Sequence, residues 1–128
     1  MRRCVFFILI GFLAALAACR LVAASDPGKV VEQYLQAKVD GDAEQIRRLL
    51  CSELEADLER ELHTFESLSG AQLSGVDCQQ QGNQPLVQCK GSILAYYGSE
   101  QTIFPLGAYR VVVEDGSWKW CGEGGRVP

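Results

Sequence analysis

The stretch that decides the fold is residues 86–97, which read LVQCKGSILAYY. Every second position from 87 onward carries a small or apolar side chain: Val87, Cys89, Gly91, Ile93, Ala95 and Tyr97. A period of two places these side chains on one face of an extended chain. The sequence therefore predicts a long β-strand with one face toward a core.

Further strands are expected on both sides of this one. The segment Leu73–Gln80 precedes it, with Gly75 as a candidate β-bulge. A third strand is predicted over Gln101–Val113 and a last one at Trp118–Cys121. Pro105 within the third strand indicates a bend, because proline cannot donate to a sheet. These segments predict a four-stranded antiparallel meander.

Three helices are predicted ahead of the strands. Asp26 as N-cap and Pro27 in the first turn begin one that ends at Gly41. The second covers residues 42–50 and the third residues 52–68. The third has one apolar face, made of Leu54, Leu58, Leu62, Phe65 and Leu68. Its charged residues are expected in solvent: Glu53, Asp57, Arg60 and Glu61. The fold class is thus α+β, with N-terminal helices packed on one face of a curved antiparallel sheet.

The first 19 residues have the three parts of a secretory signal. Arg2 and Arg3 precede an uncharged run from position 5 to position 18, which ends in Leu16-Ala17-Ala18-Cys19. These last four residues resemble a bacterial lipobox, in which the Cys is acylated. We expect a signal peptide at 1–18, then the lipidated Cys19 and a short tether at 19–26. An ordinary signal cleaved after Ala17 and an uncleaved anchor are the alternatives, but about 14 residues are too short to span a bilayer stably.

The net charge of the chain indicates which classes of binding partner are unfavourable. The chain has 12 Lys and Arg, of which Arg2 and Arg3 lie in the signal, against 16 Asp and Glu, so the rest has a net charge of −6. An acidic surface argues against nucleic acid and against attraction to anionic lipid. We therefore expect the lipid anchor alone to hold the protein at the extracytoplasmic face of the cell membrane.

Cysteines outside the signal predict disulfides. Cys4 lies in the signal and Cys19 would be acylated, which leaves Cys51, Cys78, Cys89 and Cys121. Four thiols in an exported chain indicate two disulfides, with three possible connectivities. A zinc site is the alternative, but there is no C-x-x-C pair and only one His. We expect neither a metal nor a cofactor.

The order of elements over residues 27–122 resembles the nuclear-transport-factor-2-like (NTF2-like, also cystatin-like) superfamily, in which a cone-like bent sheet wraps around a long helix. The cysteine positions look like those of small bacterial lipoproteins in that superfamily. These have a Cys at a helix end (Cys51), a Cys pair on the first hairpin (Cys78 with Cys89) and a Trp-x-x-Cys-Gly ending (118–122). The resemblance implies the fold and includes no catalytic motif; residues 123–128 would be a tail.

Within this layout we predict the pairs Cys78–Cys89 and Cys51–Cys121. Positions 78 and 89 are symmetric about Asn83-Gln84, in a stretch rich in turn formers. A hairpin that closes there places the two Cys opposite each other. Cys51 ends the second helix and Cys121 ends the last strand, so their bond would join the helical layer to the sheet.

The resemblance also suggests where a pocket would lie. The superfamily includes isomerases and cyclases with an Asp or His base and a Tyr donor inside the cone. Here Tyr34, Tyr97 and Tyr109 are expected in the core or as possible pocket lining, His63 half-exposed and Asp77 in solvent. No spacing joins these residues, so we predict no catalytic residue.

Three functions remain open at this point. The first is a non-catalytic, membrane-tethered binding or accessory module. The second is a small-molecule enzyme or carrier that uses the cone as a pocket, and the third is a structural stub for a protein partner. A cavity with Asp or His beside Tyr would favour the second, whereas a cone filled by Tyr34, Ile93 and Tyr109 would favour the first. Neither the ligand nor the partner follows from the sequence.

Overall fold

The computed structural model describes residues 26–124. The expected signal peptide, Cys19 and the tether to residue 25 lie outside the described residues, as do residues 125–128 of the expected tail. The helices are α1 (Pro27–Asp40), α2 (Ala43–Leu49), the 3₁₀ helix η1 (Ser52–Asp57) and α3 (Leu58–Leu62). The strands are β1 (Ser69–Gln80), β2 (Leu86–Tyr97), β3 (Glu100–Pro105), β4 (Ala108–Glu114) and β5 (Ser117–Glu123).

Helix α1 forms where the sequence predicts it. The Asp26 carboxylate accepts a hydrogen bond from the backbone N–H of Gly28 at 2.8 Å, and Gly41 ends the helix with a φ of 67°. A Cβ at Gly28 would lie 2.2 Å from the carbonyl oxygen of Cys78. Glycine at this position therefore lets the start of α1 lie directly on β1.

The prediction of one helix over residues 52–68 is wrong, because the helical structure ends at Leu62. Residues 52–57 form a 3₁₀ helix, residues 58–62 form α3, and residues 63–68 form turns before β1 begins at Ser69, four residues earlier than Leu73. The Thr64 hydroxyl donates to the carbonyl oxygens of Arg60 and Glu61 at 3.0 and 3.1 Å, which occupies the end of α3. The apolar spacing is still used, because each member of the predicted face is partly buried.

The sheet has five antiparallel strands instead of the predicted four. The predicted third strand is divided at residues 106–107 into β3 and β4, and both pair with β2: Ile93 lies opposite Phe104 and Val87 opposite Tyr109. Pro105 ends β3 opposite Ser92 and has no N–H to donate to the sheet. The sheet is open, and its order is β1-β2-β4-β5 with β3 beside β2.

The β1–β2 hairpin contains the first disulfide. Cys78 lies directly opposite Cys89 in the register, and their sulfur atoms are bonded. The register shifts between Ser74 and Asp77, and Gly75 there has a φ of 62°. The bulge expected at Gly75 is therefore confirmed, and so is the pairing expected from the symmetric turn.

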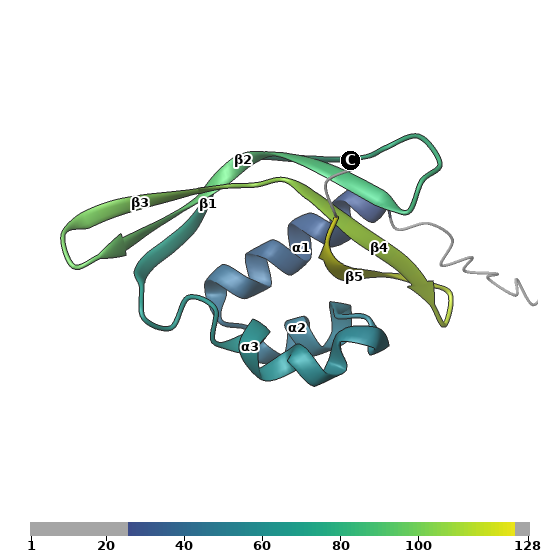
Figure 1. Ribbon diagram of the computed structural model, residues 1–128, viewed down its shortest axis with the longest axis horizontal. Helices are drawn as coiled ribbons and strands as arrows, with labels where there is room; N and C mark the ends of the chain where they lie inside the picture. Colours follow the sequence, from purple (N-terminus) through teal and green to yellow (C-terminus); the bar gives the residue numbers. More distant parts are fainter. Residues whose placement is uncertain (1–25, 125–128) are drawn as a thin grey trace, which may run out of the picture.

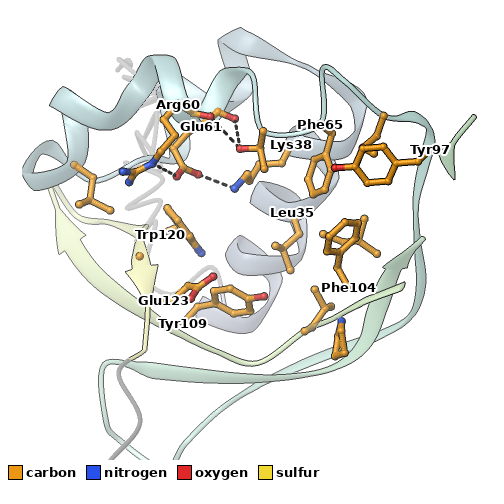
Figure 2. A pocket seen from close by; sticks show the side chains of 17 residues that line it. Leu35, Lys38, Arg60, Glu61, Phe65, Tyr97, Phe104, Tyr109, Trp120 and Glu123 are labelled. Carbon is orange, nitrogen blue, oxygen red and sulfur yellow. Dashed lines mark hydrogen bonds and ion pairs between the residues drawn. The ribbon is translucent and has the colours of Figure 1, made fainter. Parts of the chain in front are cut away.

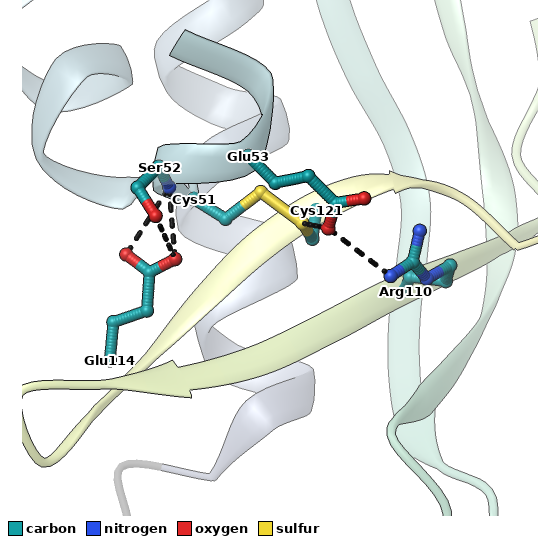
Figure 3. The surroundings of a disulfide bond; sticks show 6 residues. All are labelled: Cys51, Ser52, Glu53, Arg110, Glu114 and Cys121. Carbon is teal, nitrogen blue, oxygen red and sulfur yellow. Dashed lines mark hydrogen bonds and ion pairs between the residues drawn. A yellow bond between two sulfur atoms is a disulfide. The ribbon is translucent and has the colours of Figure 1, made fainter.

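The second disulfide joins Cys51 to Cys121, between the helical layer and β5 (Figure 3). The backbone N–H of Cys51 donates to the carbonyl of Trp120 at 2.9 Å, next to the bond. On one side, the N–H and the hydroxyl of Ser52 both donate to the Glu114 carboxylate at 2.9 Å. The start of the 3₁₀ helix is thus fixed to the sheet by a covalent bond and by polar contacts.

The elements form two unequal layers, with the sheet bending over α1 and with α2 and α3 on the other side of that helix (Figure 1). The main core lies between α1, α2 and the sheet, and its fully buried members are Val31, Tyr34, Ile46, Val87 and Val111. Among residues 26–124, no helix is long and apolar enough to span a membrane.

Candidate functional site

A pocket of about 640 Å³ opens between the end of α1, residues 58–68 and the sheet. Leu35 and Lys38 line it from α1, and Glu61 and Phe65 line it from residues 58–68, which comprise α3 and the turns that follow and are called the α3 segment below. Residues of four strands complete the wall, namely Ile93, Tyr97, Phe104, Tyr109 and Trp120 among others. This volume lies within the range of small-molecule sites in proteins.

One end of the pocket is apolar and aromatic. Phe65 and Phe104 meet edge to face, with ring centroids 6.0 Å apart. Figure 2 shows these two rings and Tyr97 gathered on the side away from the charged residues. Leu68 and Leu106 also line the pocket. This end can accept a hydrocarbon or ring portion of a ligand.

The other end contains a buried ion pair. The ammonium of Lys38 lies 2.8 Å from Oε2 of Glu61, and the two side chains are only 14% and 9% exposed. The hydroxyl of Tyr34 donates to the same Oε2 atom at 2.6 Å. Arg60, which is mostly exposed, lies 4.0 Å from the other carboxylate oxygen. The expectation that Glu61 faces solvent is wrong, because Lys38 and Tyr34 on α1 supply the partners that a buried carboxylate requires.

Tyr34 and Trp120 support the ion pair from the core side. Their rings stack with centroids 4.1 Å apart, and the Lys38 ammonium lies 5.6 Å from the Trp120 centroid and 5.9 Å from that of Tyr34. Burial and the hydrogen bond to Glu61 raise the pKa of Tyr34 above its ordinary value. Tyr34 thus stays protonated and serves as a permanent donor to Glu61.

The indole nitrogen of Trp120 is a buried hydrogen-bond donor. The residue is 4% exposed, and its indole Nε1 has no hydrogen-bond partner among the described residues. Figure 2 shows this nitrogen turned toward the side of the pocket where Leu35 and Tyr109 lie. A buried donor without an acceptor is rare in folded proteins, and it marks a place where a ligand or water can supply one.

The three tyrosines expected as possible lining have different positions. Tyr97 is 55% exposed at the rim, and Tyr109 is buried in the wall, where burial is the main reason that its pKa is raised. Tyr34 does not line the pocket but lies one layer behind it, against Trp120. His63 and Asp77 are exposed, and neither lines the pocket.

Lys38 and Glu61 are the site residues that the sequence reasoning missed. Lys38 follows Tyr34 by one helical turn, which places both on the inner side of α1. This spacing from a predicted core residue is the sequence feature that indicates a lysine beside the core. Glu61 gave no comparable signal, because its partners lie on a different helix.

The described residues contain one group of three potential metal ligands, Cys51, Glu53 and Cys121. Both sulfur atoms of this group belong to the disulfide, so neither is available as a thiolate. The pocket is a separate place in the fold, and its chemistry is that of hydrogen bonding and apolar contact.

A scan against protein-family models finds no match for this sequence, and a search of curated proteins finds none of significant similarity. The function is therefore inferred from the site geometry and from the sequence signals.

Proposed function

We propose that this chain is a membrane-tethered lipoprotein and, of the functions that the sequence leaves open, a carrier that binds a small molecule in the pocket of its α+β domain without catalysis. Three features support the proposal: the lipobox-like Leu16–Cys19, two disulfides of the kind found in exported proteins, and the pocket itself. In this proposal residues 1–18 are the signal, 19–26 the tether, and the domain lies at the extracytoplasmic face of the cell membrane.

The observation that carries the binding function is the unfilled pocket. Ile93 and Tyr109 line it without filling it, and a volume of about 640 Å³ remains between them and the α3 segment. An apolar end and a polar end in one pocket fit a ligand that has the same two parts.

The arrangement of Glu61 argues for binding rather than for proton transfer. Its Oε2 atom already accepts from Tyr34 at 2.6 Å and pairs with Lys38 at 2.8 Å. These contacts orient the carboxylate as part of a buried ion pair, and Arg60 Nε lies 4.0 Å from its other oxygen.

An enzyme of the isomerase or cyclase type is the second candidate. The observation that favours it is the carboxylate–tyrosine contact between Glu61 and Tyr34 beside an open pocket. This chemistry would require Tyr34 to reach a substrate, whereas the stacked Trp120 ring separates it from the pocket. If the protein catalyses an isomerase or cyclase reaction and Tyr34→Phe retains that activity, the Glu61–Tyr34 pair is not the catalytic group.

The finer description of the fold also belongs to this proposal. We infer an NTF2-like (cystatin-like) domain over residues 27–122, with the sheet forming a cone around α1. The order of helices followed by an antiparallel sheet, together with the two disulfides, supports it.

The pocket proposal is tested by native mass spectrometry of the full-length protein extracted from membranes in detergent. Leu106→Trp should fill part of the pocket, and Ile103→Trp is the matched control on the exposed side of neighbouring β3. We expect a bound small molecule in the wild type and the control and its loss in Leu106→Trp. If the wild type and Ile103→Trp carry only their acyl groups, this function is wrong.

The tether is tested separately by Cys19→Ser. The change should abolish acylation and leave an unprocessed or soluble product, as judged by fractionation and intact mass. A variant that is still lipidated would show that the anchor is elsewhere.

A further inference from the structure

The charges around the pocket are balanced. Four charged side chains line it, two basic and two acidic, and they are Lys38, Arg60, Glu61 and Glu123. The buried pair among them, Lys38 and Glu61, neutralises itself at 2.8 Å. The polar end therefore has no buried charge left to pair with an ionic ligand.

Two donor groups at the polar end have N–H bonds that no acceptor among the described residues uses. A lysine ammonium has three N–H groups, and only Glu61 accepts from that of Lys38 within residues 26–124. The indole N–H of Trp120 has no acceptor in the same part of the chain. Oε2 of Glu61 is already used by Lys38 and Tyr34, and Oε1 lies 4.0 Å from the Arg60 guanidinium. A ligand that supplies an acceptor without adding charge complements the two unused donors.

We propose that the pocket takes an uncharged amphiphile, with a carbonyl acceptor of the ester or amide type at the Lys38–Trp120 end and an apolar chain against Phe65 and Phe104. The inference rests on the proposed binding function and adds the chemical class of the ligand. A carboxylate or sulfonate head is disfavoured, because it would place a second negative charge beside the buried Glu61, where Lys38 is already paired and only the exposed Arg60 could offset it.

The experiment compares two probes that differ only in the terminal group of the head, which is a neutral hydroxyl in one and a sulfonate anion in the other. One is an N-acyl ethanolamine and the other an N-acyl taurine, both with the same acyl chain, the same amide carbonyl and the same diazirine near the end of the chain. Each is irradiated with the full-length protein in phosphatidylcholine nanodiscs, and the labelled peptides are identified by mass spectrometry. The measured quantity is the ratio of neutral to anionic labelling at the pocket.

The variants test whether the labelling ratio depends on the charge of Glu61. The wild type should label with the neutral probe in preference, at the aromatic end near Phe65 and Phe104. Glu61→Gln leaves the Lys38 ammonium without its counter-ion, so the ratio should move toward the anionic probe by about tenfold. Glu59→Gln, on the exposed face of the same helix, should leave the ratio unchanged. Peptide mapping without reduction checks that both disulfides are present in each variant.

Each outcome decides one part of the inference. Preferential labelling of the wild-type pocket by the anionic probe, or a ratio that Glu61→Gln does not change, would overturn the uncharged ligand while the binding function stands. Labelling of the Lys38 end by the acyl chain would overturn the orientation. If neither probe labels the pocket, the inference fails, and the native mass spectra then show whether the binding function fails with it. The wild-type ratio remains decisive even if Glu61→Gln does not fold.

Discussion

Replacing Lys38 by Met tests the buried ion pair at the polar end of the pocket. The change removes the ammonium 2.8 Å from Glu61 while it keeps an unbranched apolar side chain in contact with Trp120. Glu61, 9% exposed, would then keep Tyr34 as its close partner and the exposed Arg60 at 4.0 Å. Removal of one member of a buried pair costs about 3–5 kcal/mol, and the residual exposure together with Arg60 places the expected loss at about 3 kcal/mol.

A double-mutant cycle separates this loss from ordinary packing effects. Glu61→Gln with Lys38→Met removes both charges, and the Gln amide oxygen can still accept from Tyr34. We expect the double variant to lie within about 1 kcal/mol of the wild type, which gives a coupling energy of about 2 kcal/mol or more. Urea unfolding of the full-length protein in detergent, followed by tryptophan fluorescence with the disulfides intact, measures each corner of the cycle.

The result that would refute this reasoning is equally specific. A loss below about 1 kcal/mol for Lys38→Met would mean that the pair is hydrated and worth no more than a surface pair. Additive single losses in the double variant would mean that Lys38 and Glu61 are not coupled. Either result would also remove the charge argument for an uncharged ligand.

Two further predictions concern the disulfides and the alkaline limit of stability. Removal of the Cys51–Cys121 bond by double Ala substitution should lower the free energy of unfolding in urea by about 4 kcal/mol, and removal of the Cys78–Cys89 bond by about 3 kcal/mol. The reason is that the bonds close loops with sequence separations of 70 and 11. Equal losses would contradict the loop-entropy argument. Because the folded-state pKa of Tyr34 is raised, its stabilisation is complete below the unfolded pKa of 10.0 and is lost as the pH rises beyond that value, when the unfolded chain ionises first. Tyr34→Phe should therefore reduce the loss of stability between pH 9 and pH 11, and an unchanged pH profile would contradict it.

The elements that the sequence predicted well depend on local chemistry. The N-cap of α1 at Asp26, its end at Gly41 and the bulge at Gly75 all follow from residues within one turn of the feature itself. The Cys78–Cys89 pairing is also local, because the turn between the strands sets the register.

The features that the sequence missed depend on distant partners. Glu61 is buried because Tyr34, 27 positions earlier, and Lys38 contact it from α1, and an isolated helix would leave it in solvent. Division of the third strand at residues 106–107 likewise depends on how β3 and β4 both fit along β2. Periodicity reports which face is apolar, but it does not report which charged residue another helix will cover.

A crystal structure of the full-length protein, purified from the membranes in which it is made, tests the central claim most directly. The account predicts electron density for a small molecule in the pocket, with an acceptor atom within hydrogen-bonding distance of the Lys38 ammonium and an apolar part against Phe104. A pocket closed by its own side chains, or one filled by ordered water alone, would contradict the account.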